Sequence, residues 1–142
     1  MEHLAILAKK GHFIKKISSG TKTIESRWYK HRKAPFEAIS AGDTVYFKES
    51  GESVSVKATV ERVLFYRELT PEKIKEIITE YGTRIGVAES YATEIKDKKL
   101  CTLIFLTKVE KIKPFDIDKK GYGMMNAWIT VDAITMLKKS SL

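Results

Sequence analysis

Residues 20–27 read Gly-Thr-Lys-Thr-Ile-Glu-Ser-Arg, and this stretch lies where a short helix is expected to end and a strand to begin. The apolar residues of 13–17 follow helical spacing, and Gly20 is a suitable terminator of that helix. Residues 21–29 then read as a strand. Such a junction lets a rigid element hold side chains at the mouth of a cleft.

Alternation along this strand predicts which side chains share a face. One face carries Thr23, Glu25, Arg27 and Tyr29, and the other carries Ile24, Ser26 and Trp28. Glu25 and Arg27 therefore point the same way, with Lys22 at the start of the strand. We expect Trp28 to lie in the core and Tyr29 to be available for stacking on a base. The alternative interpretation is a surface ion pair of little energetic consequence.

The positive charge of the chain is concentrated around this motif. The chain carries a formal net charge of +8, and residues 1–33 hold nine lysine or arginine residues against Glu2 and Glu25, a net +7. Residues 34–142 hold 17 basic and 16 acidic residues. A concentrated positive field attracts phosphates, so the sequence favours nucleic acid, a nucleotide or another anion as partner; solubility alone is the alternative.

The pattern Gly-x-Lys-x-x-Glu-x-Arg, read here as Gly20, Lys22, Glu25 and Arg27, resembles the signature of ASCH domains, which are relatives of the PUA RNA-binding domain. Companion segments extend the resemblance over essentially the whole chain: 17–20, 41–43, 60–65, 69–71 and 103–106. The resemblance implies a β-barrel with helices around it and a cleft over residues 22–27.

The resemblance also implies activities on RNA. Family members are thought to act on RNA, some have shown ribonuclease activity, and one small bacterial branch removes the acetyl group from N4-acetylcytidine nucleosides. In that branch the lysine matches Lys22, a threonine stands at the position of Glu25, and a further glutamate follows the long strand. Glu76 and Glu80 are loose matches for that glutamate.

The remaining pattern predicts an α+β fold: a small PUA-like β-barrel of five to six strands flanked by two to three helices, as a single domain over residues 1–142. The expected strands are 4–8, 44–48, 54–65, 101–109 and 127–131, in addition to 21–29. A bulge is expected at Glu61-Arg62, and Pro114 is expected to stop its strand. The expected helices are 71–81, which begins after Thr70 and ends at Gly82, 132–139 and, less clearly defined, 88–99.

Several classes of protein are disfavoured by composition. The longest apolar runs, such as 103–106, are far too short to span a bilayer, so no membrane association is expected. Cys101 is the only cysteine, which excludes an internal disulfide and favours a reducing cytoplasm. The three histidines lack metal-ligand spacing, and we expect no metal or cofactor. The oligomeric state is not predicted.

The sequence therefore predicts an RNA- or nucleotide-binding protein with a basic cleft. The expected ligand-binding residues are Lys22, Glu25, Arg27, Tyr29, Lys30, Arg32, Lys33 and Tyr122. The alternative is a hydrolase of RNA or a modified nucleoside, in which a desolvated Lys22 with a lowered pKa is base or nucleophile and Glu25 its partner.

Overall fold

The computed structural model describes residues 1–119, 121–123 and 125–139. The strands are β1 (Glu2–Leu7), β2 (Ile24–Tyr29), β3 (Thr44–Glu49), β4 (Val54–Tyr66), β5 (Leu100–Phe115) and β6 (Trp128–Val131). The helices are α1 (Phe13–Ser19), α2 (Pro71–Ile85), α3 (Tyr91–Glu94) and the 3-10 turn η1 (Ile134–Met136). The predicted α+β class is confirmed.

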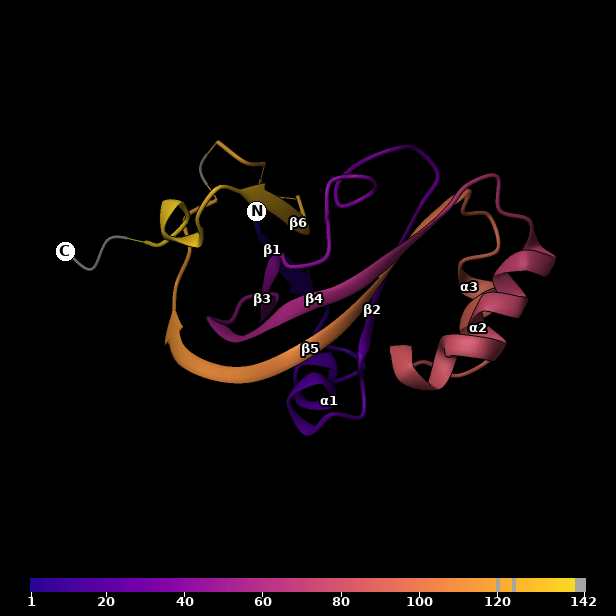
Figure 1. The fold of residues 1–142 in the computed structure, drawn as a ribbon, viewed down its shortest axis with the longest axis horizontal. Helices are drawn as coiled ribbons and strands as arrows, with labels where there is room; N and C mark the ends of the chain where they lie inside the picture. The colour runs from indigo at the N-terminus through magenta and orange to yellow at the C-terminus, as the bar shows by residue number, and fades with distance from the viewer. Residues whose placement is uncertain (120, 124, 140–142) are drawn as a thin grey trace.

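The six strands form one sheet in the order β2-β5-β4-β3-β1-β6. β1 and β3 run parallel, and every other neighbouring pair is antiparallel. The long strands β4 and β5 lie side by side and curve strongly, so that the sheet curls into a half-barrel (Figure 1). Their register shifts between Val60 and Arg62, which confirms the expected bulge. β2 and β6 are the two ends of this sheet and do not pair with each other.

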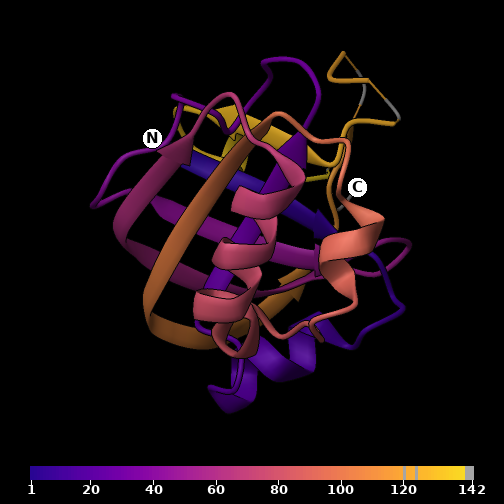
Figure 2. The same ribbon diagram turned by 90° about the vertical axis from the view of Figure 1, so that its right-hand side faces the viewer.

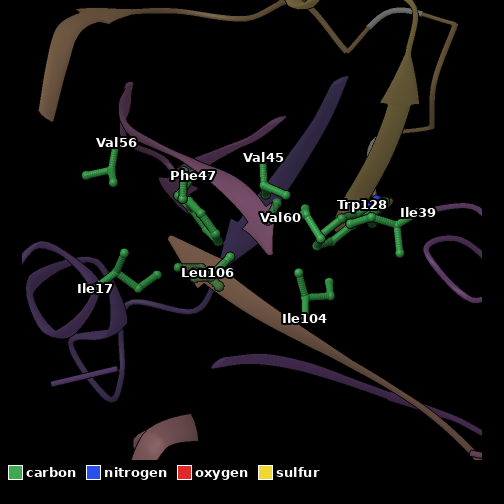
Figure 3. Packing of buried hydrophobic residues seen from close by; sticks show 12 residues of the cluster. Ile17, Ile39, Val45, Phe47, Val56, Val60, Ile104, Leu106 and Trp128 are labelled. Carbon is green, nitrogen blue, oxygen red and sulfur yellow. The ribbon is translucent and has the colours of Figure 1, made fainter. Parts of the chain in front are cut away.

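The hollow of the half-barrel is filled by an apolar cluster contributed by most strands and by α1. Its buried members are Ala5, Leu7, Ile17, Ile39, Val45, Phe47, Val56, Ala58, Val60, Ile104, Leu106 and Trp128 (Figure 3). Alternation along β3 and β4 directs every second side chain into this cluster, as expected for a sheet with one face buried. The cluster therefore fixes the curvature that brings β1 and β2 toward each other.

α2 covers the other face of β5 (Figure 2). The side-chain oxygen of Thr70 accepts a hydrogen bond from the Lys73 N–H, which caps the helix as predicted. The helix ends later than expected, because Gly82 is helical and packs against Ile78 whereas Gly86, at φ 87°, is the residue that terminates it. This extra turn carries Ile85 to the site described below.

Three other expectations differ from the structure. Residues 88–99 contain only the four-residue α3, and the expected helix over 132–139 is the three-residue η1. Pro114 does not stop its strand, because β5 continues to Phe115. The ladder shifts register there, since Lys111 pairs with Val56 but Phe115 pairs with Val54, and such an irregularity accommodates a residue without an N–H.

Candidate functional site

A cavity of about 350 Å³ lies where β2 passes between α1 and the α2–α3 pair (Figure 1). Fourteen residues line it: Ile6, Leu7, Ala8, Phe13, Lys22, Glu25, Ser26, Arg27, Trp28, Ile85, Val87, Tyr91, Ile95 and Lys98. We call it the Lys22 cavity. Residues at the end of β1 and on the edge strand β2 line this cavity. It therefore lies at the gap where no backbone hydrogen bonds join the two ends of the curled sheet.

Lys22 forms the floor of the cavity and is only 2% exposed. Its Nζ donates hydrogen bonds to the carbonyl oxygens of Ile24 and Ile85, each at 2.7 Å. It also lies 3.1 Å from Oε1 of Glu25. An ammonium group has three N–H donors, and these three acceptors use all of them. The geometry therefore suits the charged form of Lys22.

Glu25 joins Lys22 to Arg27. Its Oε2 accepts two charge-assisted hydrogen bonds, from Nε and Nη2 of Arg27, at 3.1 and 2.9 Å. Arg27 Nη2 also donates to the Ile6 carbonyl at 3.3 Å, and Nη1 donates to the Ala127 carbonyl at 3.4 Å. These contacts attach β2 to β1 and to the residue before β6, so one side chain bridges the unpaired edges of the sheet.

The pKa values of this network follow from burial and from its alternating charges. Burial lowers the pKa of Lys22 from its ordinary value, and the attraction of Glu25 opposes that shift. Burial alone would raise the pKa of Glu25, but the charges and hydrogen bonds of Lys22 and Arg27 outweigh it, so the pKa is lowered. Glu25 is thus ionised at neutral pH, and two cations flank one anion on the cavity floor.

The walls of the cavity are largely aromatic and aliphatic. The Lys22 Nζ lies 5.1 Å from the centre of the Phe13 ring, a cation–π contact. The Trp28 indole N–H donates to the Ser26 hydroxyl at 2.9 Å, which fixes the indole at the rim. Burial raises the pKa of Tyr91 to about 12, so its hydroxyl keeps its proton. That hydroxyl has no hydrogen-bond partner among the residues that the structure describes.

A second, smaller cavity of about 140 Å³ shares Arg27 and Trp28 with the first. Its other lining residues are Tyr29, Lys33, Ala34, Asn126, Ala127 and Trp128, and we call it the Lys33 cavity. The Arg27 guanidinium lies 5.1 Å from the centre of the Trp128 ring. The Lys22 cavity and the Lys33 cavity are therefore adjacent. Each has a lysine in its lining, and the Arg27 guanidinium lines both.

The structure brings together some of the predicted site residues and separates others. Lys22, Glu25 and Arg27 meet in one network, and Lys33 lies beside it. Lys30 and Arg32 are exposed outside both cavities, where Arg32 pairs with Glu37 at 3.1 Å.

The structure places both predicted tyrosines in packed surroundings. Tyr29 lines the Lys33 cavity but is 5% exposed; its ring packs edge-on against Phe36 and its hydroxyl donates to Thr102, so its ring is not free for stacking. Trp28, expected in the core, is partly buried against the cluster that contains Ile24, and it also lines both cavities. Tyr122 packs against the apolar cluster around Leu4 and is absent from both cavity linings.

The two acids considered as partners of Lys22 also lie elsewhere. Glu76 and Glu80 are exposed on the surface of α2, whose buried stripe of isoleucines faces β5. Neither lines the Lys22 cavity. Helical spacing explains this result, since Ile74, Ile77 and Ile78 define the inward face and positions 76 and 80 fall outside it.

The fold matches solved structures over nearly its whole length. The ASCH protein of Zymomonas mobilis superposes with a TM-score of 0.70 at 18% identity, covering 97% of this chain and 96% of that one. A mutant form of the same protein gives a TM-score of 0.71, also at 18% identity, and covers 97% of this chain and 99% of that one. The chain has the ASCH fold. No family model and no curated protein matches it.

Sequence patterns did not reveal the walls that the ASCH fold builds around the motif. Phe13 was assigned only to an apolar helix stripe, and Tyr91 and Lys98 fall in a segment without clear periodicity. Ile85 lies beyond the expected end of its helix. Ile85, Tyr91 and Lys98 lie more than sixty positions from Lys22 in the sequence, so only the tertiary structure brings them to it. No helix in the described part of the chain has the length and apolar character that a membrane crossing needs.

Proposed function

We propose that this chain binds single-stranded RNA or a nucleotide, with one base held in the Lys22 cavity. The observation that carries the proposal is the combination of a positively charged floor with aromatic walls in a hollow of about 350 Å³. This volume lies at the lower end of the range for small-molecule pockets, and it suits one nucleotide unit better than a duplex.

Each part of the cavity has a role in this proposal. Trp28 and Tyr91 supply flat apolar surface on which an unpaired base stacks. The Tyr91 hydroxyl supplies a hydrogen bond to a base edge. Lys22, Glu25 and Arg27 are two cations and one anion, so the floor carries a net positive charge that favours carbonyl oxygens and phosphates.

The Lys33 cavity is the proposed position of the neighbouring phosphate. Its volume of about 140 Å³ is below the range for a whole ligand, but a phosphate group needs less room. Lys33 and the shared guanidinium of Arg27 would both face such a phosphate. The rest of the basic surface around residues 30–33 would supply less specific attraction.

The hydrolase alternative is less well supported by the geometry. Burial lowers the pKa of Lys22, which a lysine base requires, but all three of its N–H donors already have acceptors. A base or nucleophile needs a free lone pair directed at the substrate. Lys22 is therefore better suited to fixing the charge and shape of the floor.

Fluorescence anisotropy with a labelled single-stranded RNA tests the proposal. Wild type is compared with Trp28→Leu, which removes the stacking surface and keeps the buried charges, at salt concentrations from about 50 to about 200 mM. Removal of one stacking platform is expected to weaken binding by about 5- to 100-fold, corresponding to about 1–3 kcal/mol. The same samples are run on a gel to check that the RNA is intact.

The matched control is Tyr66→Leu, which changes a half-buried aromatic residue on β4 outside both cavities. Salt-dependent binding that Trp28→Leu weakens and Tyr66→Leu does not is the expected result. Equal affinities for all three proteins, or the absence of binding by wild type, would contradict the proposal. Cleavage that depends on Lys22 would assign the protein to the hydrolases instead.

A further inference from the structure

Lys48 is a lysine with a mostly buried side chain that lies outside the Lys22 cavity. It lies near the end of β3, is 9% exposed, and makes no hydrogen bond or ion pair within the described part of the chain. No buried side-chain nitrogen or oxygen of the described residues lacks a hydrogen-bond partner, so the unpaired ammonium group of Lys48 reaches solvent. The buried stem therefore holds in place an ammonium group whose N–H donors are open to a ligand.

Lys48 lines a third cavity, of about 320 Å³, together with Ile117, Asp118, Lys119 and Lys139. Three lysines from three distant parts of the chain thus face one hollow that contains one carboxylate. Burial lowers the pKa of Lys48, and the charge of Lys119 lowers it further, whereas Asp116 and Glu52 raise it. The like charges are therefore close enough to repel each other.

Glu52 and Asp116, the two acids that raise the pKa of Lys48, also have other partners. Glu52 pairs with Lys9 at 2.9 Å, and Oδ1 of Asp116 accepts a hydrogen bond from the Ser53 hydroxyl at 2.5 Å. The backbone around the cavity is also well ordered by its own hydrogen bonds, from Asp118 N–H to the Leu137 carbonyl and from Lys139 N–H to the Asp116 carbonyl, each at 2.8 Å. Backbone hydrogen bonds thus join the two segments that carry Lys119 and Lys139.

We propose that Lys48, Lys119 and Lys139 form a binding site for a phosphate group. Phosphate matches the observations because it is a compact anion that accepts hydrogen bonds from several ammonium groups at once. The phosphate is either free or part of an RNA backbone. Ile6 pairs with Lys48 across the β1–β3 ladder and also lines the Lys22 cavity, so the two sites lie on adjacent strands.

Thermal unfolding with added inorganic phosphate tests this site independently of the Lys22 cavity. Wild type is compared in phosphate and in chloride at equal ionic strength, because a ligand that binds only the folded state raises the melting temperature. We expect phosphate to raise it by a few degrees. Lys48→Met, which keeps the length of the side chain and removes its charge, is expected to abolish this rise.

The same variant gives a second readout in phosphate-free buffer. Because the ammonium group of Lys48 reaches solvent and makes no ion pair in the described part of the chain, Lys48→Met is expected to unfold at about the same temperature as wild type. The control Lys113→Met removes an exposed charge on β5 and is expected to keep the response to phosphate. A wild type that phosphate and chloride stabilise equally, or a Lys48→Met variant that keeps the response, would overturn a site for free phosphate.

Anisotropy with single-stranded RNA distinguishes the two sources of phosphate. Weaker RNA binding by Lys48→Met than by Lys113→Met supports backbone phosphate, and unchanged RNA binding with a lost phosphate response supports a free anion. If neither ligand distinguishes the two variants, the site does not exist. Failure of the Lys22 cavity to bind RNA would leave the inorganic phosphate result unaffected, so the two proposals fail separately.

Discussion

The molecule contains two buried polar networks that resemble each other in burial and differ in what surrounds them. Lys22, Glu25 and Arg27 form one network at the floor of an open cavity. The second is centred on His3, which is 0% exposed and contacts Asp43, Thr130 and Trp128. The first network contains three charged groups; the second is centred on a histidine whose pKa is lowered by burial, which favours its neutral form.

The tautomer of His3 follows from its partners. The indole N–H of Trp128 is only a donor, so Nδ1 of His3 accepts from it at 3.2 Å, and Nε2 donates to Asp43 at 2.8 Å. Burial lowers the pKa of His3, and Asp43 opposes the shift without reversing it. His3 thus has its hydrogen-bond partners within the protein; His3, Asp43 and Thr130 line none of the cavities described above, and Trp128 lines the Lys33 cavity alone. Its role is to join β1, β6 and the turn before β3.

The comparison teaches that burial of polar groups alone does not identify a functional site. A neutral hydrogen-bonded group adds specificity to a core at moderate cost, whereas two buried cations and an anion are expensive to maintain. The Lys22 network is the energetically costly one, and it lies at the gap between the two ends of the sheet, where the Lys22 cavity is found. This contrast supports the proposal that the Lys22 network binds a ligand, whereas the His3 network joins strands.

The largest expected effect follows from neutralising the centre of the charged network. Glu25→Gln leaves Lys22 and Arg27 buried without their counter-charge, and it is expected to lower the free energy of unfolding by about 3–5 kcal/mol. Urea denaturation followed by circular dichroism measures this change. The control Glu110→Gln breaks an exposed pair with Lys57 and is expected to change stability little. A small loss for Glu25→Gln would show that the network is not tightly coupled.

The His3 network is expected to make stability depend on mild acidification. The pKa of His3 is below its ordinary value in the folded state, so between about pH 6.5 and that lowered value the unfolded chain binds a proton that the folded chain does not. Stability is therefore fully present above about pH 6.5 and falls as the pH falls. Melting temperatures measured from about pH 7.5 to about pH 5 test this expectation.

His3→Gln is the matched variant for that experiment. It removes the titrating group and keeps a side chain able to donate to Asp43, so its melting temperature is expected to be lower than that of wild type but less dependent on pH. A slope equal to that of wild type would assign the pH dependence to other groups. RNA affinity should change little in this variant, since His3 lies outside the cavities.

A smaller effect is expected for the charge beside the cavity. Lys33→Ala removes one proposed phosphate contact, so it is expected to weaken RNA binding severalfold and to reduce the dependence of log affinity on log salt by about 0.7. Lys30→Ala removes the same charge from an exposed position outside both cavities. Equal effects of the two variants would show that the basic segment acts only as a diffuse field.

The smallest effect concerns the two tryptophans, each of which reports on one network. Trp28 lines both cavities, whereas Trp128 is 3% exposed, bonded to His3 and lines only the Lys33 cavity. Acrylamide is expected to quench Trp128→Phe, which retains Trp28, more strongly than Trp28→Phe. Added RNA is expected to protect the fluorescence of Trp28 more than that of Trp128. Equal quenching of the two variants would show that Trp28 and Trp128 are equally accessible to solvent, which would contradict this expectation.

The sequence was sufficient for the general architecture and for the centre of the site. Helix capping at Thr70, the alternation in β4 and the Gly20-Lys22-Glu25-Arg27 pattern are local signals, and each is reflected in the structure.

The walls of the site were not predictable in the same way. Alternation assigns side chains to two faces, but it does not say how completely each face is covered, so it predicted neither the burial of Tyr29 nor the position of Trp28 in the lining of both cavities. Phe13, Ile85 and Tyr91 reach Lys22 only because the sheet curls. The lysines around Lys48 likewise lie in unremarkable segments that only tertiary structure brings together.

The most direct test of the central claim is a comparison of amide NMR spectra with and without a short single-stranded RNA. The contrast between the two networks predicts that shifts concentrate at residues 22–28, 85–87 and 91, and that His3, Asp43 and Thr130 change little. Shifts centred on the His3 network, or a spectrum that RNA leaves unchanged, would contradict the assignment of the Lys22 cavity as the binding site.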